Sequence, residues 1–305
     1  MAVVFELTIL GSSSALPTSQ RYPSAHVLNV HERFFLIDCG EGTQMQLRKY
    51  KIKYGRIHNI FISHLHGDHI FGLYGLLSSL NLSGRTSPLR LHAPAEYREI
   101  LQSHLSDFDV HLNFDIDFIP LEGDQPLKIF ENKSITVFSL PLRHRVPSFG
   151  FLFREKQKER KIIKEAINEY NIPLAEIHKI KKGSDFYTAA GKRIPNKDIT
   201  LDPPKPRSFA YCSDTMYFKR LSEFVRGVDL LYHEATFASD NKDLAARTGH
   251  STSEQAARVA YDADVGKLII GHFSARYKDV GPLLDEAREI FPRTIAAEEG
   301  SVIPV

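Results

Sequence analysis

The seven residues from position 63 to position 69 hold a high density of side chains that bind metal ions. They read Ser-His-Leu-His-Gly-Asp-His, which places four potential ligands within six positions: His64, His66, Asp68 and His69. Neutral imidazole and carboxylate are ligands that suit zinc and related divalent ions. The apolar runs 60–62 and 69–77 predict a buried strand before the motif and a helix after it. We therefore expect a metal site on this strand-to-helix loop rather than a histidine-rich surface turn.

Polar side chains also follow apolar runs elsewhere in the chain. Those that stand at or shortly after a run typical of a buried strand are His144, Asp214, His233, Glu234 and His272. Ligands bind beyond the carboxyl ends of strands in open α/β sheets, so these side chains are expected to meet at one edge. One such histidine alone would more often be a buried structural residue, and Asp214 alone could cap a turn. Their number beside the 63–69 motif favours a common site.

The candidate ligands number seven, too many for one tetrahedral zinc ion and suited to two ions. The predicted division gives one ion His64, His66 and His144, the other ion Asp68, His69 and His272, and both ions the bridging Asp214. Two metal ions roughly 3.5–4 Å apart can hold a hydroxide between them and clamp a phosphoryl oxygen. Because coordination lowers the pKa of bound water, the ligand set predicts a hydrolase that uses metal-activated hydroxide.

A hydrolytic site also needs a proton for the departing oxygen, and histidine is the most frequent donor. His250 lies in the polar turn Gly-His-Ser-Thr at 249–252, before a helix that is predicted to start near Ser253. We expect His250 to supply this proton and Glu234 to hold the orientation of its ring. The alternative is that His250 only caps the helix.

The elements that must position these residues alternate between short apolar strands and helices. Strands are predicted at 5–10, 34–37, 60–62, 89–92, 114–119, 134–140, 149–153, 208–212, 229–232 and 267–270. Helices are predicted at 43–49, 68–80, 94–104, 156–170, 218–225, 253–263 and 282–290. This alternation is typical of an α/β fold with helices covering the sheet faces. We expect the 305 residues to form a single domain, 1–305, with one insertion.

The composition excludes several classes of protein. Hydrophobic residues make up 42% and charged residues 25% of the chain, which is usual for a soluble globular protein. The two cysteines, Cys39 and Cys212, lie far apart, which argues against a disulfide scaffold and for a reducing compartment. The N-terminus lacks the basic stretch of a signal peptide, and no apolar run is long enough to span a membrane. A cytoplasmic protein without a membrane partner is expected.

The segment 154–197 differs from the rest in its charge. It carries 12 Lys and Arg against 6 Asp and Glu, whereas the remainder of the chain is slightly acidic. Five apolar residues at helical spacing, Ile162, Ile163, Ala166, Ile167 and Tyr170, predict a helix that Pro173 closes. A basic insertion on an acidic body favours a polyanionic partner, although a solvated helix without a partner is the equal alternative.

Several motifs carry a resemblance to a known family. They are Gly-Ser-Ser-Ser-Ala-Leu-Pro at 11–17, Asp-Cys-Gly-Glu-Gly-Thr-Gln at 38–44, the metal motif, Ser-Asp-Thr at 213–215, His-Glu-Ala-Thr at 233–236, Gly-His-Ser-Thr at 249–252 and Gly-His-Phe-Ser at 271–274. With them the chain resembles the metallo-β-lactamase superfamily and, within it, the ribonuclease Z family of tRNA 3′-end endonucleases, in its short form. The resemblance runs over the whole length, and the His-Glu-Ala-Thr and His-Ser-Thr pair is its most specific part.

The resemblance implies a four-layer αββα sandwich with an inserted flexible arm, two zinc ions per subunit and a homodimer. It gives metal-ligand roles to the same seven residues and indicates Asp68 as the proton acceptor for the attacking water. It further implies that the insertion 154–197 grips the elbow of precursor tRNA, where phosphate contacts supply affinity without reading sequence. The implied reaction is phosphodiester hydrolysis by an endoribonuclease that removes the 3′ trailer. It leaves a 3′-hydroxyl on the tRNA and a 5′-phosphate on the trailer.

Two segments depart from the family pattern. The arm usually carries a Gly-Pro pair, whereas residues 172–176 read Ile-Pro-Leu-Ala-Glu, which concerns tRNA binding rather than cleavage. The family loop Pro-x-Lys-x-Arg-Asn reads Pro-Thr-Ser-Gln-Arg-Tyr at 17–22, so its Lys and Asn are replaced. Because that loop helps the family reject tRNAs ending in CCA, this is where a difference in CCA discrimination is expected.

Two other functions fit parts of the pattern. A phosphodiesterase of the same superfamily that acts on small or cyclic nucleotide esters would need no arm. An RNA-binding protein could keep zinc for folding alone, but structural zinc sites are normally single-ion cages rich in cysteine, and none of the seven residues is cysteine. A redox di-iron site is disfavoured because His66 stands where such relatives use a glutamate. The endoribonuclease is therefore the favoured interpretation.

Overall fold

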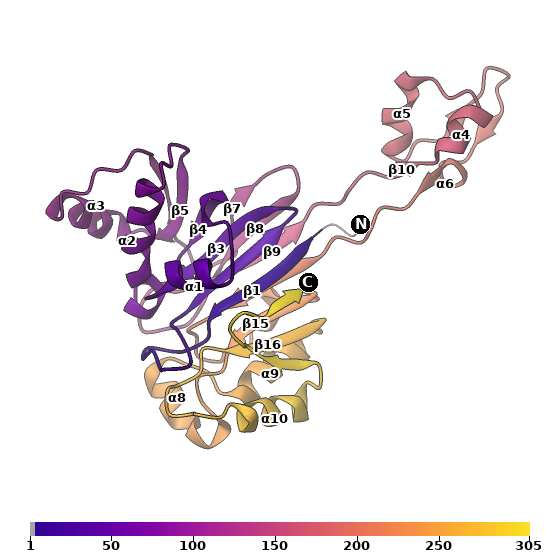
Figure 1. Ribbon diagram of the computed structural model, residues 1–305. Coiled ribbons are helices and arrows are strands. Elements are labelled where there is room, and N and C mark those ends of the chain that lie inside the picture. The colour runs from indigo at the N-terminus through magenta and orange to yellow at the C-terminus, as the bar shows by residue number, and fades with distance from the viewer. Residues whose placement is uncertain (1–3) are drawn as a thin grey trace. The chain divides into compact units, whose positions relative to one another are not determined.

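The computed structural model describes residues 4–305, and its two large β-sheets have seven strands each (Figure 1). The first sheet contains, in spatial order, β18 (Val302–Pro304), β1 (Phe5–Gly11), β2 (Ala25–Val30), β3 (Arg33–Cys39), β4 (Ile57–Phe61), β5 (Leu89–Pro94) and β6 (Ile116–Leu121). The second contains β17 (Thr294–Ala296), β16 (Lys267–Gly271), β15 (Leu230–Glu234), β14 (Ser208–Cys212), β9 (Phe149–Glu155), β8 (Ile135–Pro141) and β7 (Leu127–Glu131).

Helices cover the outer face of each sheet (Figure 1). Those beside the first sheet are α1 (Thr43–Lys49), α2 (Gly67–Leu82) and α3 (Tyr97–Asp107), with the short 3-10 helix Tyr54–Arg56 before β4. Those beside the second are α7 (Leu221–Phe224), α8 (Lys242–Thr248), α9 (Ser253–Asp262) and α10 (Gly281–Ile290), with the 3-10 helix Ser239–Asn241 before α8. The predicted α/β architecture, an αββα sandwich, is confirmed.

Aromatic side chains fill the space between the two sheets. Phe61 of β4 meets Phe151 of β9 with ring centroids 5.3 Å apart, and Phe35 of β3 meets Phe153 of β9 at 5.8 Å. All four rings are buried, and their tilted or edge-on contacts are the arrangements that aromatic pairs prefer. This core holds β4 and β9, whose flanking loops carry the predicted ligands His64, His66 and His144, in fixed relative positions.

Helix α2 is fixed against the first sheet by an apolar stripe. Its buried leucines recur at the spacing of one helix face, at Leu73, Leu76, Leu77 and Leu80. They pack into a cluster with buried residues of β3, β4 and β5. Because burying each such side chain contributes about 1.5–3 kcal/mol, the stripe fixes the first turn of α2, which holds Asp68 and His69, beyond the end of β4.

The parallel strands of the second sheet end at one edge. Cys212 of β14 pairs in register with His233 of β15, and Glu234 of β15 pairs with Gly271 of β16. Asp214, two residues beyond Cys212, and His272, the residue after Gly271, therefore leave the sheet beside each other.

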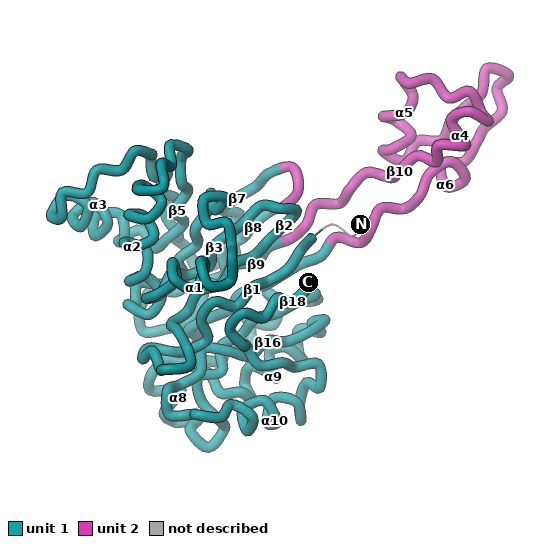
Figure 2. The backbone as a smooth tube through the Cα atoms, viewed as in Figure 1, with its two compact units in different colours: residues 1–132, 136–153, 207–305 teal, residues 133–135, 154–206 magenta. Residues whose placement is uncertain are grey.

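The chain forms two compact units (Figure 2). The larger comprises the described residues up to 132 together with 136–153 and 207–305, and the smaller comprises 133–135 and 154–206. The smaller unit contains β10 (Lys161–Ile162), α4 (Lys164–Glu169), α5 (Leu174–Lys181), β11 (Phe186–Tyr187), β12 (Arg193–Ile194), α6 (Asn196–Ile199) and β13 (Thr200–Leu201). Its own core consists of Ala166, Ile172, Ile180, Phe186, Ile194 and Ile199.

The prediction of one helix over residues 156–170 is wrong for the first half of this range. Lys161 and Ile162 form β10, which pairs antiparallel with Leu201 and Thr200, and only residues 164–169 are helical. The two β-branched residues Ile162 and Ile163 favour an extended chain once a partner strand is available. Pro173 likewise does not close that helix but precedes the next one, α5, as its N-cap residue.

The predicted strands all appear, shifted by a few residues at their ends. The strands that were not predicted are β2, β7, β17 and β18 of the large sheets and β10, β11, β12 and β13 of the smaller unit. Helix α8 and the arm helices α5 and α6 were also missed. Among residues 4–305, no helix combines the length and apolar character needed to cross a membrane.

Candidate metal centre

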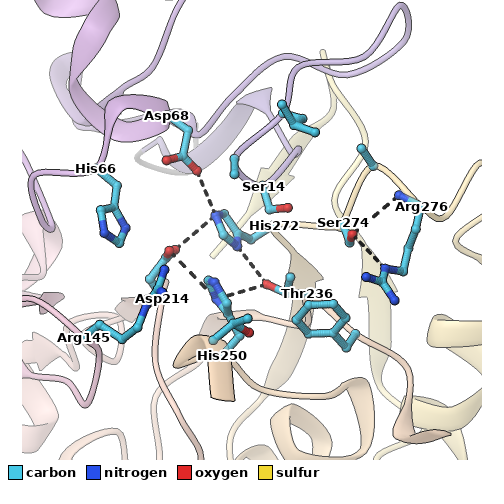
Figure 3. A pocket seen from close by; sticks show the side chains of 15 residues that line it. Ser14, His66, Asp68, Arg145, Asp214, Thr236, His250, His272, Ser274 and Arg276 are labelled. Carbon is cyan, nitrogen blue, oxygen red and sulfur yellow. Dashed lines mark hydrogen bonds and ion pairs between the residues drawn. The ribbon is translucent and has the colours of Figure 1, made fainter. Parts of the chain in front are cut away.

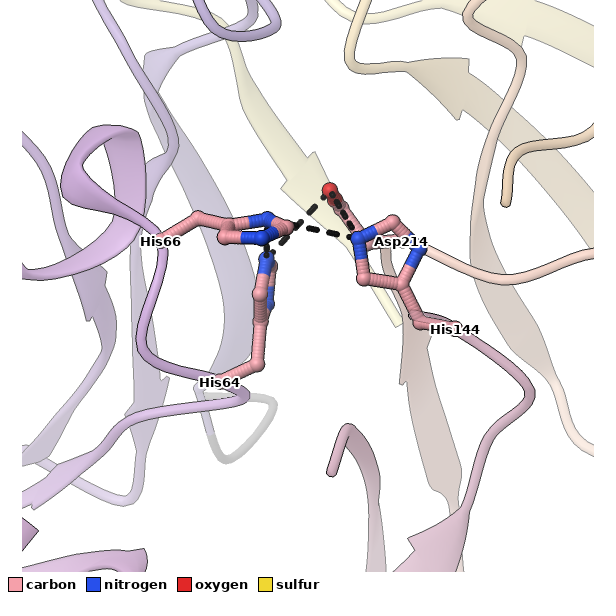
Figure 4. A group of neighbouring side chains, drawn as sticks. All are labelled: His64, His66, His144 and Asp214. Carbon is pink, nitrogen blue, oxygen red and sulfur yellow. Dashed lines mark hydrogen bonds and ion pairs between the residues drawn. The ribbon is translucent and has the colours of Figure 1, made fainter. Parts of the chain in front are cut away.

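The seven residues predicted as ligands come together at one edge of the two sheets. Their nitrogen and oxygen atoms form two groups that could each hold a metal ion: His64, His66, His144 and Asp214 in one, and Asp68, His69 and His272 in the other. The loop after β4 and the first turn of α2 supply four of them, and the loops after β8, β14 and β16 supply the other three. Figure 4 shows the first group, in which the three imidazoles point toward the carboxylate.

Within the first group the donor atoms face one another at short range. His66 Nδ1 lies 3.0 Å from His64 Nε2 and 3.3 Å from His144 Nε2. Asp214 Oδ2 lies 3.4 Å from His64 Nε2 and 3.8 Å from His144 Nε2. Three imidazole nitrogens and one carboxylate oxygen thus converge on one small volume.

The second group repeats this arrangement with one more carboxylate. Asp68 Oδ2 lies 3.4 Å from both His69 Nε2 and His272 Nε2, and these two nitrogens are 3.4 Å apart. The other oxygen of Asp214, Oδ1, lies 3.2 Å from His69 Nε2 and 3.1 Å from His272 Nε2. The carboxylate of Asp214 is therefore shared, with one oxygen toward each group.

Buried acceptors fix the orientation of the imidazoles. His69 Nδ1 donates to Asp38 Oδ2 at 2.8 Å, and Tyr211 donates its hydroxyl to the same oxygen at 2.8 Å. Ser63 Oγ donates to Asp38 Oδ2 at 2.9 Å and accepts from His64 Nδ1 at 3.0 Å. One buried carboxylate thus orients two imidazoles, one directly and one through a hydroxyl, which is the usual way in which ligands are held for a metal.

A second network supports the opposite side of the cluster. His272 Nδ1 donates to Thr236 Oγ1 at 2.9 Å, and this hydroxyl donates to Glu234 Oε2 at 2.6 Å. The other oxygen of Glu234, Oε1, accepts from His250 Nδ1 at 2.9 Å. His144 Nδ1 donates to the backbone carbonyl of Gly249 at 2.6 Å. The predicted contact between Glu234 and His250 is therefore present, and it is continuous with a candidate ligand.

The backbone at His272 is unusual for a residue other than glycine. His272 has φ of 60°, in the left-handed region, where a non-glycine residue signals a constraint. The preceding Gly271 is also constrained, because a Cβ atom there would lie 2.2 Å from the hydroxyl of Tyr232. The strand β16 thus ends in a tight bend that turns the ring of His272 toward Asp68 and Asp214.

The donor set fits divalent cations. Because the Nδ1 atoms of His69 and His272 donate to Asp38 and Thr236, these rings in their neutral forms would turn two lone pairs toward each other at 3.4 Å. Although burial opposes charge on His69, the carboxylates of Asp214, Asp68 and Asp38 raise its pKa well above the usual value. A single proton could serve only one of the nitrogens, whereas a cation can take both lone pairs together with the carboxylate oxygens.

His250 does not cap the following helix. That role belongs to Thr252, whose hydroxyl accepts from the backbone of Gln255 while the Gln255 side chain accepts from the backbone of Thr252. Burial disfavours the charged form of His250, but the buried carboxylate of Glu234 raises its pKa to about 9. The ring therefore stays available at the site, with its Nδ1 held and its other nitrogen uncommitted to Glu234.

A cavity of about 570 Å³ opens beside the cluster (Figure 3). Its wall includes Asp68, Asp214, His250 and His272. Two arginines, Arg145 and Arg276, also line it. The cavity therefore brings the candidate proton acceptor, the candidate proton donor and positive charge to one solvent-accessible space.

Sequence reasoning missed several residues that hold the ligands. Asp38 lies in the 38–44 motif, which was noted for the family resemblance without a role at the site. Thr236 and the carbonyl of Gly249 belong to the motifs that contain Glu234 and His250, so proximity to those motifs was the only signal. His233, considered at first with the strand-end residues, is buried with its Nδ1 donating to the carbonyl of Glu234 and belongs to neither ligand group.

Comparison with known proteins shows to which family the chain belongs. The model of the anti-Pycsar protein Apyc1 matches residues 5–163, and the model of the beta-lactamase superfamily domain matches residues 199–273. A ribonuclease Z from Bacteroides thetaiotaomicron is 47% identical over 99% of this chain and 95% of its own length. The chain belongs to the ribonuclease Z family. A ribonuclease Z from Cytophaga hutchinsonii, 46% identical over 97% of this chain and 95% of its own, extends this range of relatives.

Solved structures agree with membership of the ribonuclease Z family. The short form of human tRNase Z has a TM-score of 0.71 at 27% identity, and the match covers 98% of this chain and all of that one. The metallo-beta-lactamase fold protein YhfI from Bacillus subtilis has a TM-score of 0.69 at 20% identity, covering 98% of each chain. The second likeness concerns the fold alone. The predicted family and the metallo-β-lactamase fold are thus confirmed.

Proposed function

We propose that this member of the ribonuclease Z family is an endoribonuclease that hydrolyses the phosphodiester bond between a tRNA and its 3′ trailer. It leaves a 3′-hydroxyl on the tRNA and a 5′-phosphate on the trailer. The observation that carries the proposal is the carboxylate of Asp214, with Oδ2 beside the imidazoles of one ligand group and Oδ1 beside those of the other. The high identity to ribonuclease Z proteins over nearly the whole chain supports RNA as the substrate.

The seven ligands would hold two zinc ions per subunit. His64, His66 and His144 would bind one, Asp68, His69 and His272 the other, and Asp214 both. When bound, such a pair lowers the pKa of coordinated water and polarises the phosphoryl oxygen. Zinc is favoured because imidazole nitrogens dominate the set.

Asp68 would accept one proton of the reaction, and His250, held by Glu234, would donate another. The side chain of Asp68 is about 8% exposed and lines the cavity, so its carboxylate can accept the proton of the attacking water. Glu234 holds His250 by Nδ1, which leaves Nε2 to donate a proton to the departing 3′-oxygen of the tRNA. Glu234 itself is fully buried and acts through His250 as a positioning residue.

The smaller unit would bind the tRNA. Its α5 ends in a basic turn, and several lysines on its surface, Lys164, Lys182, Lys192 and Lys197 among them, are exposed. Lysine contacts to phosphates supply salt-dependent affinity without base recognition, as expected for one site acting on many tRNAs. We propose that this arm, predicted as 154–197, corresponds to the unit 133–135 and 154–206. The homodimer and the cytoplasmic location belong to the same proposal.

Cleavage of a defined RNA tests the proposal. Purified protein loaded with zinc is incubated with a 3′-extended precursor tRNA that carries a 5′ label, and the cut is mapped at single-nucleotide resolution. We expect one cut after the discriminator base, a 3′-hydroxyl on the tRNA fragment, and loss of cutting in Asp68→Ala. Uncut RNA at high enzyme and zinc concentrations would contradict the proposal.

A phosphodiesterase for small nucleotide esters is the second candidate, because the metal cluster alone serves any phosphodiester. This candidate is supported by the match of residues 5–163 to the family model of the anti-Pycsar protein Apyc1, which is not named as a ribonuclease Z. Removal of residues 156–205 separates the two functions. For the RNA enzyme, the loss of cutting should far exceed the loss of bis(p-nitrophenyl) phosphate hydrolysis. For the alternative, turnover of the natural ester should not depend on the arm.

A further inference from the structure

Two arginines stand on opposite sides of the reacting groups. In Figure 3, Arg145 and Arg276 lie at the two ends of a row that contains Asp214, His250 and His272. They come from different parts of the chain, since Arg145 follows His144 in the loop before β9 and Arg276 lies in the loop after β16. An RNA strand carries a phosphate at every nucleotide, so a cation on each side of the cleaved phosphate can meet a neighbouring one.

Arg276 is already held in place by the protein. Its Nη1 donates to Asn241 Oδ1 at 3.2 Å, and its Nε donates to Ser274 Oγ at 3.3 Å. Its guanidinium lies over the ring of Phe237 at 5.0 Å from the centroid. Much of its hydrogen-bonding capacity is therefore used in the free protein.

Arg145 differs in this respect. Its side chain is exposed, and its Cγ packs close to Gly249, where a Cβ atom would come within 3.4 Å of it. Within residues 4–305, no hydrogen bond, ion pair or ring contact of its guanidinium is found. The carboxylates nearest the cavity, Asp68 and Asp214, are turned to the imidazoles instead. Arg145 thus brings five free donors to the cavity wall.

We propose that Arg145 binds an RNA phosphate adjacent to the cleaved one and positions the strand in the cavity. The inference rests on the proposed function, because it requires a substrate with more than one phosphate. Arginine suits the task, since its planar fork can donate two parallel hydrogen bonds to one phosphate. A small diester has no neighbouring phosphate and cannot use this contact.

The test compares Arg145→Gln with Arg143→Gln as a matched control. Arg143 lies two positions away in the same loop and is also exposed, but its guanidinium lies over Phe218, 4.8 Å from the ring centroid, and outside the cavity. Steady-state cleavage of a 3′-extended precursor tRNA is measured at several salt concentrations, beside hydrolysis of bis(p-nitrophenyl) phosphate. An Arg145→Lys variant keeps the charge without the fork.

We expect Arg145→Gln to raise KM for the RNA about tenfold, the smaller end of the effect of losing a charged hydrogen bond. The slope of log(kcat/KM) against log[salt] should become shallower by about 0.7, the value for one phosphate contact to a single strand. Arg145→Lys should keep the slope and recover part of KM. Arg143→Gln should match the wild type on the RNA.

Three results would overturn the inference. Wild-type protein that leaves the RNA uncut overturns the proposed function and this inference with it. Wild-type cleavage with unchanged KM and salt slope in Arg145→Gln overturns the inference alone. An equal loss on the RNA and on the small diester does the same, because it assigns Arg145 to the reacting phosphate or to local structure.

Discussion

Glu234 Oε1 accepts a hydrogen bond from His250 Nδ1 at 2.9 Å, while Glu234 Oε2 accepts one from the hydroxyl that holds His272. One buried carboxylate therefore positions both the candidate proton donor and a candidate metal ligand. The chemistry at the departing oxygen and the geometry of the cluster are joined through this side chain.

The pair should behave as one unit in kinetics. His250→Ala is expected to lower the single-turnover rate on precursor tRNA by roughly 10²–10⁴, the usual contribution of a general acid. Glu234→Gln should cost less, about tenfold, because the ring stays and loses only the charge of its acceptor. In the double variant the loss should be smaller than the product of the two single losses, and it should still exceed that of His250→Ala alone, because Glu234 also holds His272 through Thr236. Effects that multiply in the double variant would show that the two residues act independently.

Asp38 should control metal affinity although it is not a ligand. Asp38→Asn removes the charged acceptor of His69 Nδ1 and is expected to weaken metal binding by about 10–100-fold. Tyr211→Phe, which removes one donor to Asp38 and leaves the contact with His69, should have a smaller effect. Competition with a chromogenic chelator measures both, and equal affinities for Asp38→Asn and the wild type would count against this role.

Gly271 should not tolerate a side chain. Gly271→Ala places a Cβ atom 2.2 Å from the Tyr232 hydroxyl and is expected to lower the free energy of unfolding by about 1–3 kcal/mol. Tyr232→Phe removes that buried hydroxyl and should recover part of the loss. Urea unfolding of both single variants and the double variant checks this. Simple additivity of the two changes would contradict the steric explanation.

His26 should make folding sensitive to acid. It is fully buried between the rings of Tyr211 and Tyr232, and burial lowers its pKa to about 3. The unfolded chain, with a His26 pKa near 6.5, binds more protons between these values, so stability present above pH 6.5 is lost as the pH falls toward 3. At pH 5 the resulting loss in the free energy of unfolding is about 2 kcal/mol.

His26→Phe should therefore flatten the fall in unfolding free energy between pH 7 and pH 5. His111→Gln, which changes a histidine whose side chain is 89% exposed, is the control and should leave the curve unchanged. Urea midpoints at several pH values provide the measurement. A pH dependence of His26→Phe as steep as that of the wild type would reject the assignment.

Exposed lysines of the arm should contribute to tRNA affinity. The double change Lys182→Ala and Lys192→Ala is expected to weaken tRNA binding and to lower the slope of log K against log[salt] by about 0.9 for each contact to a duplex phosphate. A variant in which the exposed Lys53 and Lys219 of the larger unit are both replaced by Ala has the same net charge as the arm variant and serves as the control. Equal losses in the two double variants would indicate general charge attraction rather than an arm contact.

The candidate ligands could be selected from the sequence because each follows a local rule. His64 to His69 form a contiguous motif, and Asp214 and His272 stand just beyond apolar runs that end at one sheet edge. Glu234 and His250 were paired by their chemistry, and their 2.9 Å contact agrees with that reasoning. Metal occupancy at these positions stays a prediction.

What the sequence did not predict depends on contacts between distant segments. Asp38 meets Tyr211 across 173 positions, and nothing in either segment specifies the other. The segment 161–163 has the spacing of a helix, yet pairing with residues 200–201 makes it a strand. Strand β2 was missed because it is buried along its whole length and lacks the alternation of an exposed strand.

The insertion leaves the second sheet between two strands that are neighbours, since β9 ends at Glu155 and β14 begins at Ser208. The insertion joins the last residue of β9 to the first residue of β14. The candidate ligands stand at the other termini of these strands, His144 before β9 and Asp214 after β14. Evolution can therefore lengthen, shorten or exchange the inserted segment while the hydrolytic machinery stays untouched. New RNA targets could be acquired in this way without a change in the residues of the metal centre.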